Sequence, residues 1–249
     1  MRSLLPLIGL VGALFTGTAA AQERIDLELV LLADASGSID DAEIHFQRRG
    51  YASAITDPQV LSAITGGGYQ KIAITYVEWG SASSQEVVVP WTVVDGPETA
   101  AAFAQRLLGP PRLAFGRNAI GSAIAAAHAM IETNAIEAER RVIDLSADSA
   151  NSWSGIPIEV ARRAALEAGI VINGLAVLCR SCSGRPVSYD LERAFAERII
   201  GGPGSFVITA DGNERFATAV RNKLVLEIAG APHPNGELHT TEALRGERW

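Results

Sequence analysis

Lysine and cysteine are both scarce in this chain of 249 residues. Two cysteines are too few for a fold that is held together by disulfides. Lys71 and Lys223 are the only lysines, so arginine carries almost all of the positive charge. With 28 acidic and 21 basic residues, the formal net charge is −7. An acidic protein is not expected to have nucleic acid as its main partner, because phosphate binding requires a basic face.

The motifs of several common enzyme classes are also missing. The sequence contains no G-x-S-x-G nucleophile elbow, H-E-x-x-H zinc motif, Walker loop or G-x-G-x-x-G dinucleotide loop. The four histidines, His45, His128, His233 and His239, do not have the spacing of metal ligands. We therefore expect that the protein is not an enzyme.

The only long apolar run lies at the N-terminus. Arg2 precedes an apolar stretch over residues 4–15, and residues 18–21 (TAAA) end in an A-x-A pattern that predicts cleavage before Gln22. Neither this stretch nor any later one reaches the roughly 20 residues that a membrane-spanning helix needs. We expect a signal peptide over residues 1–21 and a periplasmic or secreted protein with no membrane anchor after cleavage. The alternative is a retained N-terminal anchor.

Predicted strands and helices alternate along the rest of the chain. The strands are expected at residues 25–33, 71–77, 86–94, 141–147, 170–178 and 205–209. The helices are expected at residues 40–56, 97–108, 119–133, 158–168, 190–200 and 214–229. A short connection and Pro90 favour an antiparallel hairpin that places the third strand at an edge.

This order of elements predicts the fold class. We expect an α/β fold with an open, doubly wound, mostly parallel six-stranded sheet, one antiparallel edge strand and helices on both faces. One domain spans residues 22–229, and a polar, flexible tail follows over residues 230–249. In such sheets ligands bind outside the carboxyl ends of the strands, so the residues that follow each strand are the candidates for a site.

The loop after the first predicted strand carries the strongest chemical signal. Asp34, Ser36 and Ser38 place oxygen-bearing side chains at alternate positions, and Gly37 permits a tight turn. One carboxylate and two hydroxyls suit a hard cation with few charged ligands, Mg²⁺ or Mn²⁺. The alternative is that these residues only form a turn and an N-cap.

Two other loops add oxygen donors at the same edge. Asp148 directly follows the strand at 141–147, and Asn118 directly precedes the helix at 119–133. N-capping of helices alone does not explain why oxygen donors come from several separate strand-to-helix loops. The sequence therefore predicts a metal site formed by Asp34, Ser36, Ser38, Asn118 and Asp148.

These residues resemble the metal-ion-dependent adhesion site (MIDAS) of von Willebrand factor type A domains. The resemblance rests on Asp34-x-Ser36-x-Ser38, the loop at Asn118 and Asp148 after an apolar strand, and it covers residues 25–229. Segments 142–148 (VIDLSAD) and 201–207 (GGPGSFV) further resemble an uncharacterised group of exported bacterial type A domain proteins. That narrower resemblance implies no established activity.

The resemblance implies a mode of binding. In the family the two serines ligate the metal directly and the aspartates act directly or through water, while one open position takes a Glu or Asp carboxylate of a protein partner. The family's threonine falls on Asn118 here, and an amide has a different reach. We expect an exported binding module that recognises an acidic protein partner through a divalent cation. The alternatives are a metal-dependent hydrolase and a scaffold domain with a degenerate metal site.

Three further features complete the expectations. Cys179 and Cys182 form a C-x-x-C pair that favours a local disulfide in an oxidising compartment. Asp144 lies in a predicted buried strand and therefore needs a partner, either at the strand end or an arginine such as Arg141. Trp153 is a candidate for partner contact, with core packing as the alternative.

Overall fold

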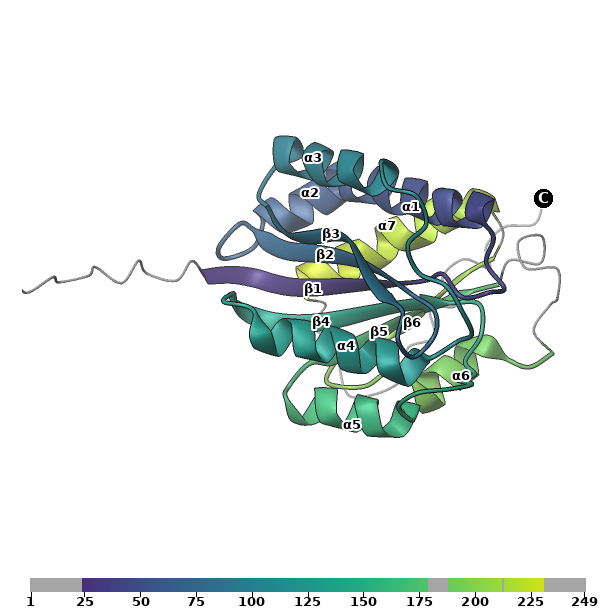
Figure 1. The fold of residues 1–249 in the computed structure, drawn as a ribbon. Helices are drawn as coiled ribbons and strands as arrows, with labels where there is room; N and C mark the ends of the chain where they lie inside the picture. Colours follow the sequence, from purple (N-terminus) through teal and green to yellow (C-terminus); the bar gives the residue numbers. More distant parts are fainter. Residues whose placement is uncertain (1–23, 179–187, 212, 231–249) are drawn as a thin grey trace, which may run out of the picture.

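The structure is a computed structural model that describes residues 24–178, 188–211 and 213–230. Its six strands form one sheet in the order β3-β2-β1-β4-β5-β6 (Figure 1). They are β1 (Arg24–Asp34), β2 (Ile72–Trp79), β3 (Gln85–Val94), β4 (Glu137–Ala147), β5 (Val171–Val177) and β6 (Val207–Ala210). β3 runs antiparallel to β2 at one edge, and the other neighbouring strands are parallel. The predicted fold class is confirmed.

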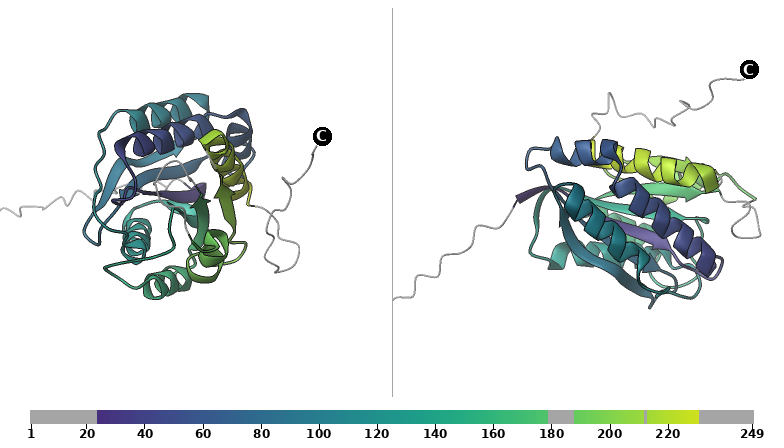
Figure 2. Two further views of the ribbon diagram at one scale, coloured as in Figure 1. Left: turned by 90° about the vertical axis from the view of Figure 1, so that its right-hand side faces the viewer. Right: turned by 90° about the horizontal axis from the view of Figure 1, so that it is seen from above.

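Helices cover both faces of this sheet. Those of the described residues are α1 (Asp41–Ile55), α2 (Pro58–Thr65), α3 (Pro97–Leu108), α4 (Ile120–Thr133), α5 (Ile158–Glu167), α6 (Leu191–Arg198) and α7 (Asn213–Ala229). α1, α2, α3 and α7 pack on one face, and α4, α5 and α6 pack on the other (Figures 1 and 2). No helix in the described part of the chain is both long enough and apolar enough to span a membrane.

The central strand β1 is apolar on both sides. Leu27, Leu29 and Leu31 pack toward α1 and α7, whereas Val30 and Leu32 pack toward α4. Successive side chains of a strand point to opposite faces, so a strand that is covered on both faces has a continuous apolar run. This is the pattern from which the sequence predicts a doubly covered sheet.

The short helix α2 is missing from the sequence-based prediction, which ends the preceding helix at Asp57 and Pro58. Asp57 caps α2 by accepting a hydrogen bond from the Gln59 amide at 2.8 Å, and Pro58 occupies its first turn. The same Asp-Pro pair therefore ends one helix and starts the next. Eight residues are too few to give a clear helical periodicity.

Both ends of the described chain lie at the amino-terminal edge of the central strands. Arg24 begins β1 and Gly230 follows α7, and both line a cavity of about 770 Å³ together with the first residues of β4. The predicted signal peptide, the pair Cys179 and Cys182, and residues 231–249 of the predicted tail lie outside the described residues. The signal peptide, the disulfide and the flexible tail thus stay predictions.

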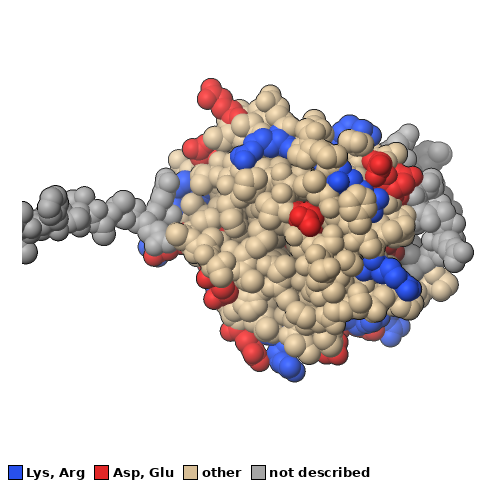
Figure 3. Space-filling model, viewed as in Figure 1, with Lys and Arg blue, Asp and Glu red and all other residues tan. Residues whose placement is uncertain are grey.

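Charged groups are interspersed on the molecular face drawn in Figure 3. Most of this face is uncharged, the lysine, arginine, aspartate and glutamate side chains lie mainly near its border, and no continuous basic patch covers it. The lack of a basic patch on this face agrees with the excess of acidic over basic residues in the sequence.

Asp144 on β4 does not pair with Arg141, which corrects that suggestion. Lys223 of α7 lies 2.6 Å from Asp144 Oδ1 and 2.5 Å from Glu227 Oε1, and the three side chains are at most 1% exposed. Asn173 also donates to Glu227 Oε1 at 3.0 Å. Arg141 instead pairs with Glu132 at 2.6 Å. A lysine about 80 residues away could not be identified as the partner from the local sequence pattern.

The first prediction concerns the pH dependence of stability. Burial, followed by the neighbouring Asp144 carboxylate, raises the pKa of Glu227 from 4.5 to about 7. Between these values the folded state binds more protons than the unfolded state, so the free energy of unfolding should fall as the pH rises through this window. The contribution is on the order of 1 to 3 kcal/mol.

Glu227→Gln should therefore reduce this loss, because glutamine keeps an acceptor for Lys223 without titrating. Urea unfolding at about pH 5 and pH 7 measures the difference for both proteins. An equally steep loss in the variant would contradict the assignment to Glu227. Glu197→Gln is the matched control, because that carboxylate is exposed and paired with Arg193.

Candidate metal-binding site

The two predicted metal-binding aspartates lie at the carboxyl ends of the two central strands. Asp34 is the last residue of β1, and Asp148 directly follows β4. β1 and β4 are paired in parallel, with Ala33 opposite Ser146. The two loops therefore leave the sheet beside each other. They lie at the edge that faces the viewer in the left-hand view of Figure 2.

Hydrogen bonds connect three of the predicted donors, and a fourth lies beside them. Asp34 Oδ1 accepts from the Ser36 amide at 2.8 Å, and the hydroxyls of Ser36 and Ser38 lie 3.2 Å apart. The Ser38 hydroxyl and the Asp148 carboxylate lie near each other, and Asp148 lies near enough to Asp34 for the two charges to interact. Asp34 and Ser36 are 1% and 0% exposed. The structure thus brings Asp34, Ser36, Ser38 and Asp148 together.

This cluster has an excess of negative charge. Burial, and next the charge of Asp148, raise the pKa of Asp34 to about 7, and burial also raises the pKa of Asp148. Asp34 Oδ2 is buried and has no hydrogen-bond partner among the described residues. An unpartnered buried carboxylate oxygen beside a second carboxylate is a site that a divalent cation would stabilise.

The donor set fits a hard cation with few charged ligands. Across the part of the chain that the structure describes, no three His, Cys, Asp or Glu side chains lie close enough to hold a metal by themselves. An ion at this site would therefore depend on the hydroxyls of Ser36 and Ser38 as well as on the two carboxylates. Two carboxylates and neutral oxygens are ligands that suit Mg²⁺ or Mn²⁺.

Arg112 fixes the backbone of the loop after β1, and sequence reasoning missed it. Its guanidinium donates to the carbonyls of Ala35 at 2.5 Å, Ser36 at 3.0 Å and Ile39 at 2.7 Å. These bonds hold the backbone on which the donor side chains are carried. The residue follows two prolines and belongs to no motif, so its pattern gives no signal of this role.

The segment that carries Arg112 is held by a second arginine, which is buried. Arg48 of α1 pairs with Glu78 of β2 at 2.7 Å, and both side chains are fully buried. Arg48 also donates to the carbonyls of Pro110 and Pro111. The site loop is thus connected to the core through two arginines in succession.

Two further contacts involve the loop after β1, and one of them places the loop of Asn118 beside the site. Gln47 of α1 donates to the Asp34 carbonyl at 3.1 Å, and the Gly37 amide donates to the Gly116 carbonyl at 2.7 Å. Asn118, two residues after Gly116, is 7% exposed. Its loop therefore lies against residues 34–38, while its part as a metal ligand stays a prediction.

Solved structures similar to this one are von Willebrand factor type A domains. One, described as von Willebrand factor type A from Catenulispora acidiphila, matches with a TM-score of 0.59 and 16% identity, covering 82% of this chain and 43% of that chain. Another is the vWF domain of the type V pili tip protein Mfa5 from Porphyromonas gingivalis, with a TM-score of 0.55, 10% identity and coverage of 88% and 99%.

A third is proximal thread matrix protein 1 from the mussel byssus with a zinc-occupied MIDAS motif. It matches with a TM-score of 0.58 and 15% identity, covering 84% of this chain and 49% of that chain. This chain therefore spans less than half the length of the first and third of these structures. At such low identity the similarity establishes the fold alone.

The chain thus has a fold similar to that of von Willebrand factor type A domains. The chain belongs to the protein family DUF1194, described as a protein of unknown function, whose match covers residues 24–232. No curated protein has a significantly similar sequence.

The second prediction tests the role of Arg112. Arg112→Ala leaves several partly buried carbonyls without a donor and should lower the free energy of unfolding by about 2 kcal/mol. Arg106→Ala is the matched control, because that exposed guanidinium donates only to a hydroxyl, that of Thr92, at 3.2 Å. Its effect should stay within about 0.5 kcal/mol. If urea unfolding shows the same decrease in the free energy of unfolding for both variants, Arg112 does not support the loop.

Proposed function

We propose that this domain is an exported binding module that recognises a protein partner through a divalent cation held by Asp34, Ser36, Ser38 and Asp148. The observation that carries the proposal is the grouping of four oxygen-bearing side chains, one of which, Asp34, has a buried carboxylate oxygen (Oδ2) without a hydrogen-bond partner among the described residues. The residues come from two loops at the ends of adjacent strands, where ligands bind in α/β sheets.

The chemistry of the donors favours binding an acidic group. A bound Mg²⁺ or Mn²⁺ would offer an open coordination position to a carboxylate from outside. Neutral hydroxyls from Ser36 and Ser38 leave such an ion more positively charged than four carboxylates would. Arg112 and the backbone contacts hold the loop in place, so little reorganisation is needed at the moment of binding.

Named features of similar structures support a binding role. One is a pilus tip protein, another is the pilus adhesin SpaC from Lactobacillus rhamnosus GG, and a mussel byssus protein has zinc in its MIDAS motif. Export is part of the proposal, because the N-terminal sequence predicts a signal peptide. Binding without catalysis is likewise proposed, and assays on phosphate esters with Mg²⁺ or Mn²⁺ test the hydrolase alternative.

The third prediction is a metal-dependent gain in thermal stability. At about 100 times the dissociation constant, Mg²⁺ or Mn²⁺ should stabilise the wild-type domain by about 2.7 kcal/mol. For a domain of this size this corresponds to a rise in Tm on the order of 5 °C or more. Differential scanning calorimetry with EDTA, Mg²⁺ and Mn²⁺ measures it. No shift with either ion would end the metal proposal.

Asp34→Asn separates metal binding from folding. Asparagine keeps an acceptor for the Ser36 amide and removes the repulsion between two buried carboxylates. In EDTA the variant should therefore be at least as stable as the wild type, yet it should lose the metal-induced rise in Tm. A variant that retains the full rise would show that Asp34 does not hold the ion.

The fourth prediction concerns Asn118. If its amide oxygen ligates the ion, Asn118→Ala should weaken Mg²⁺ affinity by about tenfold, because one ligand is lost. Isothermal titration measures the affinity. Asn134→Ala is the control, because Asn134 lies at the other end of α4 and caps that helix end by donating to the Met130 carbonyl at 2.9 Å. An unchanged affinity in Asn118→Ala would remove this residue from the ligand set.

A further inference from the structure

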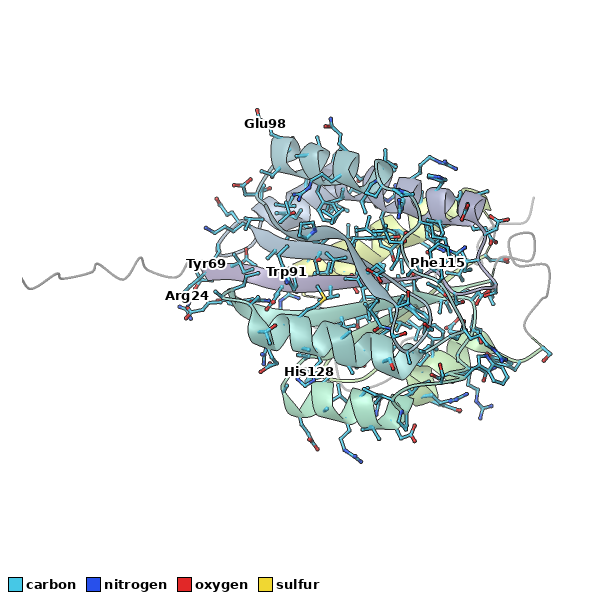
Figure 4. All side chains as sticks on the ribbon, viewed as in Figure 1. Arg24, Tyr69, Trp91, Glu98, Phe115 and His128 are labelled. Atoms are coloured by element: carbon cyan, nitrogen blue, oxygen red, sulfur yellow. The ribbon has the colours of Figure 1, made fainter. Side chains whose placement is uncertain are left out.

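Exposed aromatic side chains gather around the candidate metal-binding site. Trp153 and Phe115 are 64% and 57% exposed, more than any other large apolar side chain among the described residues. Phe115 lies three residues before Asn118, and Trp153 lies five residues after Asp148. Figure 4 shows Phe115 among the loops beyond the carboxyl ends of the strands. Exposed apolar groups that cluster at one place mark interaction surfaces.

The backbone under these rings is held in place. The Trp153 amide donates to the Asn118 carbonyl at 2.8 Å, and the Phe115 carbonyl accepts from the Ser81 amide at 2.9 Å. The Phe115 amide donates to the Ser84 hydroxyl at 3.1 Å. The two exposed rings are therefore carried by loops whose backbone is fixed by hydrogen bonds. Side chains that are already positioned lose little entropy when a partner binds.

An arginine accompanies each of the two rings. The Arg112 guanidinium lies 4.8 Å from the Phe115 ring centre, and the Arg117 guanidinium lies 5.3 Å from that of Trp153. Arg112 is engaged with carbonyls of the site loop. Arg117 is exposed, and no acidic side chain of the described residues forms an ion pair with it.

Aromatic and arginine side chains together are typical of the residues that dominate binding energy at protein interfaces. A positive charge with no acidic partner among the described residues, displayed by an acidic protein, is complementary to an acidic group of another protein. The rings sit beside the site and not within it, so they can contact the residues that flank an acidic group at the metal.

We infer that Phe115, Trp153 and Arg117 form a specificity surface for one kind of partner: a protein segment with an acidic side chain flanked by apolar residues. This inference rests on the proposed function. The acidic side chain reaches the metal-binding residues, the apolar neighbours pack on Trp153 and Phe115, and a second acidic group pairs with Arg117. We call these three residues the aromatic rim.

Selection from random displayed peptides tests the inference. Peptides of about 12 residues on phage are selected against the full chain in Mg²⁺. The expected peptides place Asp or Glu next to aromatic or aliphatic residues. Synthetic copies should bind Trp153→Ala at least about tenfold more weakly than the wild type. Trp153→Phe should recover part of the loss, because it keeps an aromatic ring.

Two controls separate the rim from the metal site and from folding. Leu226→Ala removes an exposed apolar side chain near the opposite edge of the sheet and should leave peptide affinity unchanged. Trp153→Ala should keep the Mg²⁺-induced rise in Tm of the wild type. Arg117→Glu should weaken binding of the peptides with two acidic residues more than binding of those with one.

Each outcome has a distinct meaning. Peptides that are released by EDTA but bind Trp153→Ala as tightly as the wild type overturn the rim and leave the metal-mediated function in place. Peptides that depend on Trp153 but bind equally in EDTA support the rim and contradict the metal-mediated function. Selected peptides without acidic residues overturn the inference. A wild-type dimer that Trp153→Ala dissociates also overturns it, because the occupant is then a second copy of this chain.

Discussion

The parallel pairing of β1 with β4 is the constraint on which the rest of the site depends. It brings two aspartates, 114 residues apart in sequence, to the same end of the central strands. Arg112 donates to carbonyls of the loop after β1, the backbone that carries Ser36 and Ser38. Two like charges in a buried place disfavour the metal-free state, which is the physical reason that a cation would bind there.

Much of the fold could be predicted from the sequence, because it depends on local patterns. The stretch at 25–33 begins as an alternating pattern and becomes a continuous apolar run, which predicts a doubly covered strand, and Pro90 predicts the antiparallel edge. α2 was missed because its eight residues carry too little periodicity. The convergence of Asp34, Ser36, Ser38 and Asp148 was predictable because the carboxyl ends of parallel strands share one edge.

The supporting residues could not be predicted, because their roles arise from tertiary contacts. Arg112 acts through backbone carbonyls, which no side-chain pattern reveals. Lys223 pairs with Asp144 only because α7 packs across the sheet near β4. The aromatic rim was anticipated only in part, at Trp153, since exposure depends on how the loops fold over one another.

The placement of Arg24 and Gly230, the first and last described residues, has a consequence for how the domain can be displayed. Arg24 begins β1 and Gly230 follows α7, and both lie at the edge opposite the two aspartates. A linker attached at either residue would thus join the domain at the amino-terminal edge of its central strands, and the loops of the candidate metal-binding site would point away from the linker into solution. Immobilisation on a surface through either end, or fusion to a second domain there, would leave the approach to these loops open.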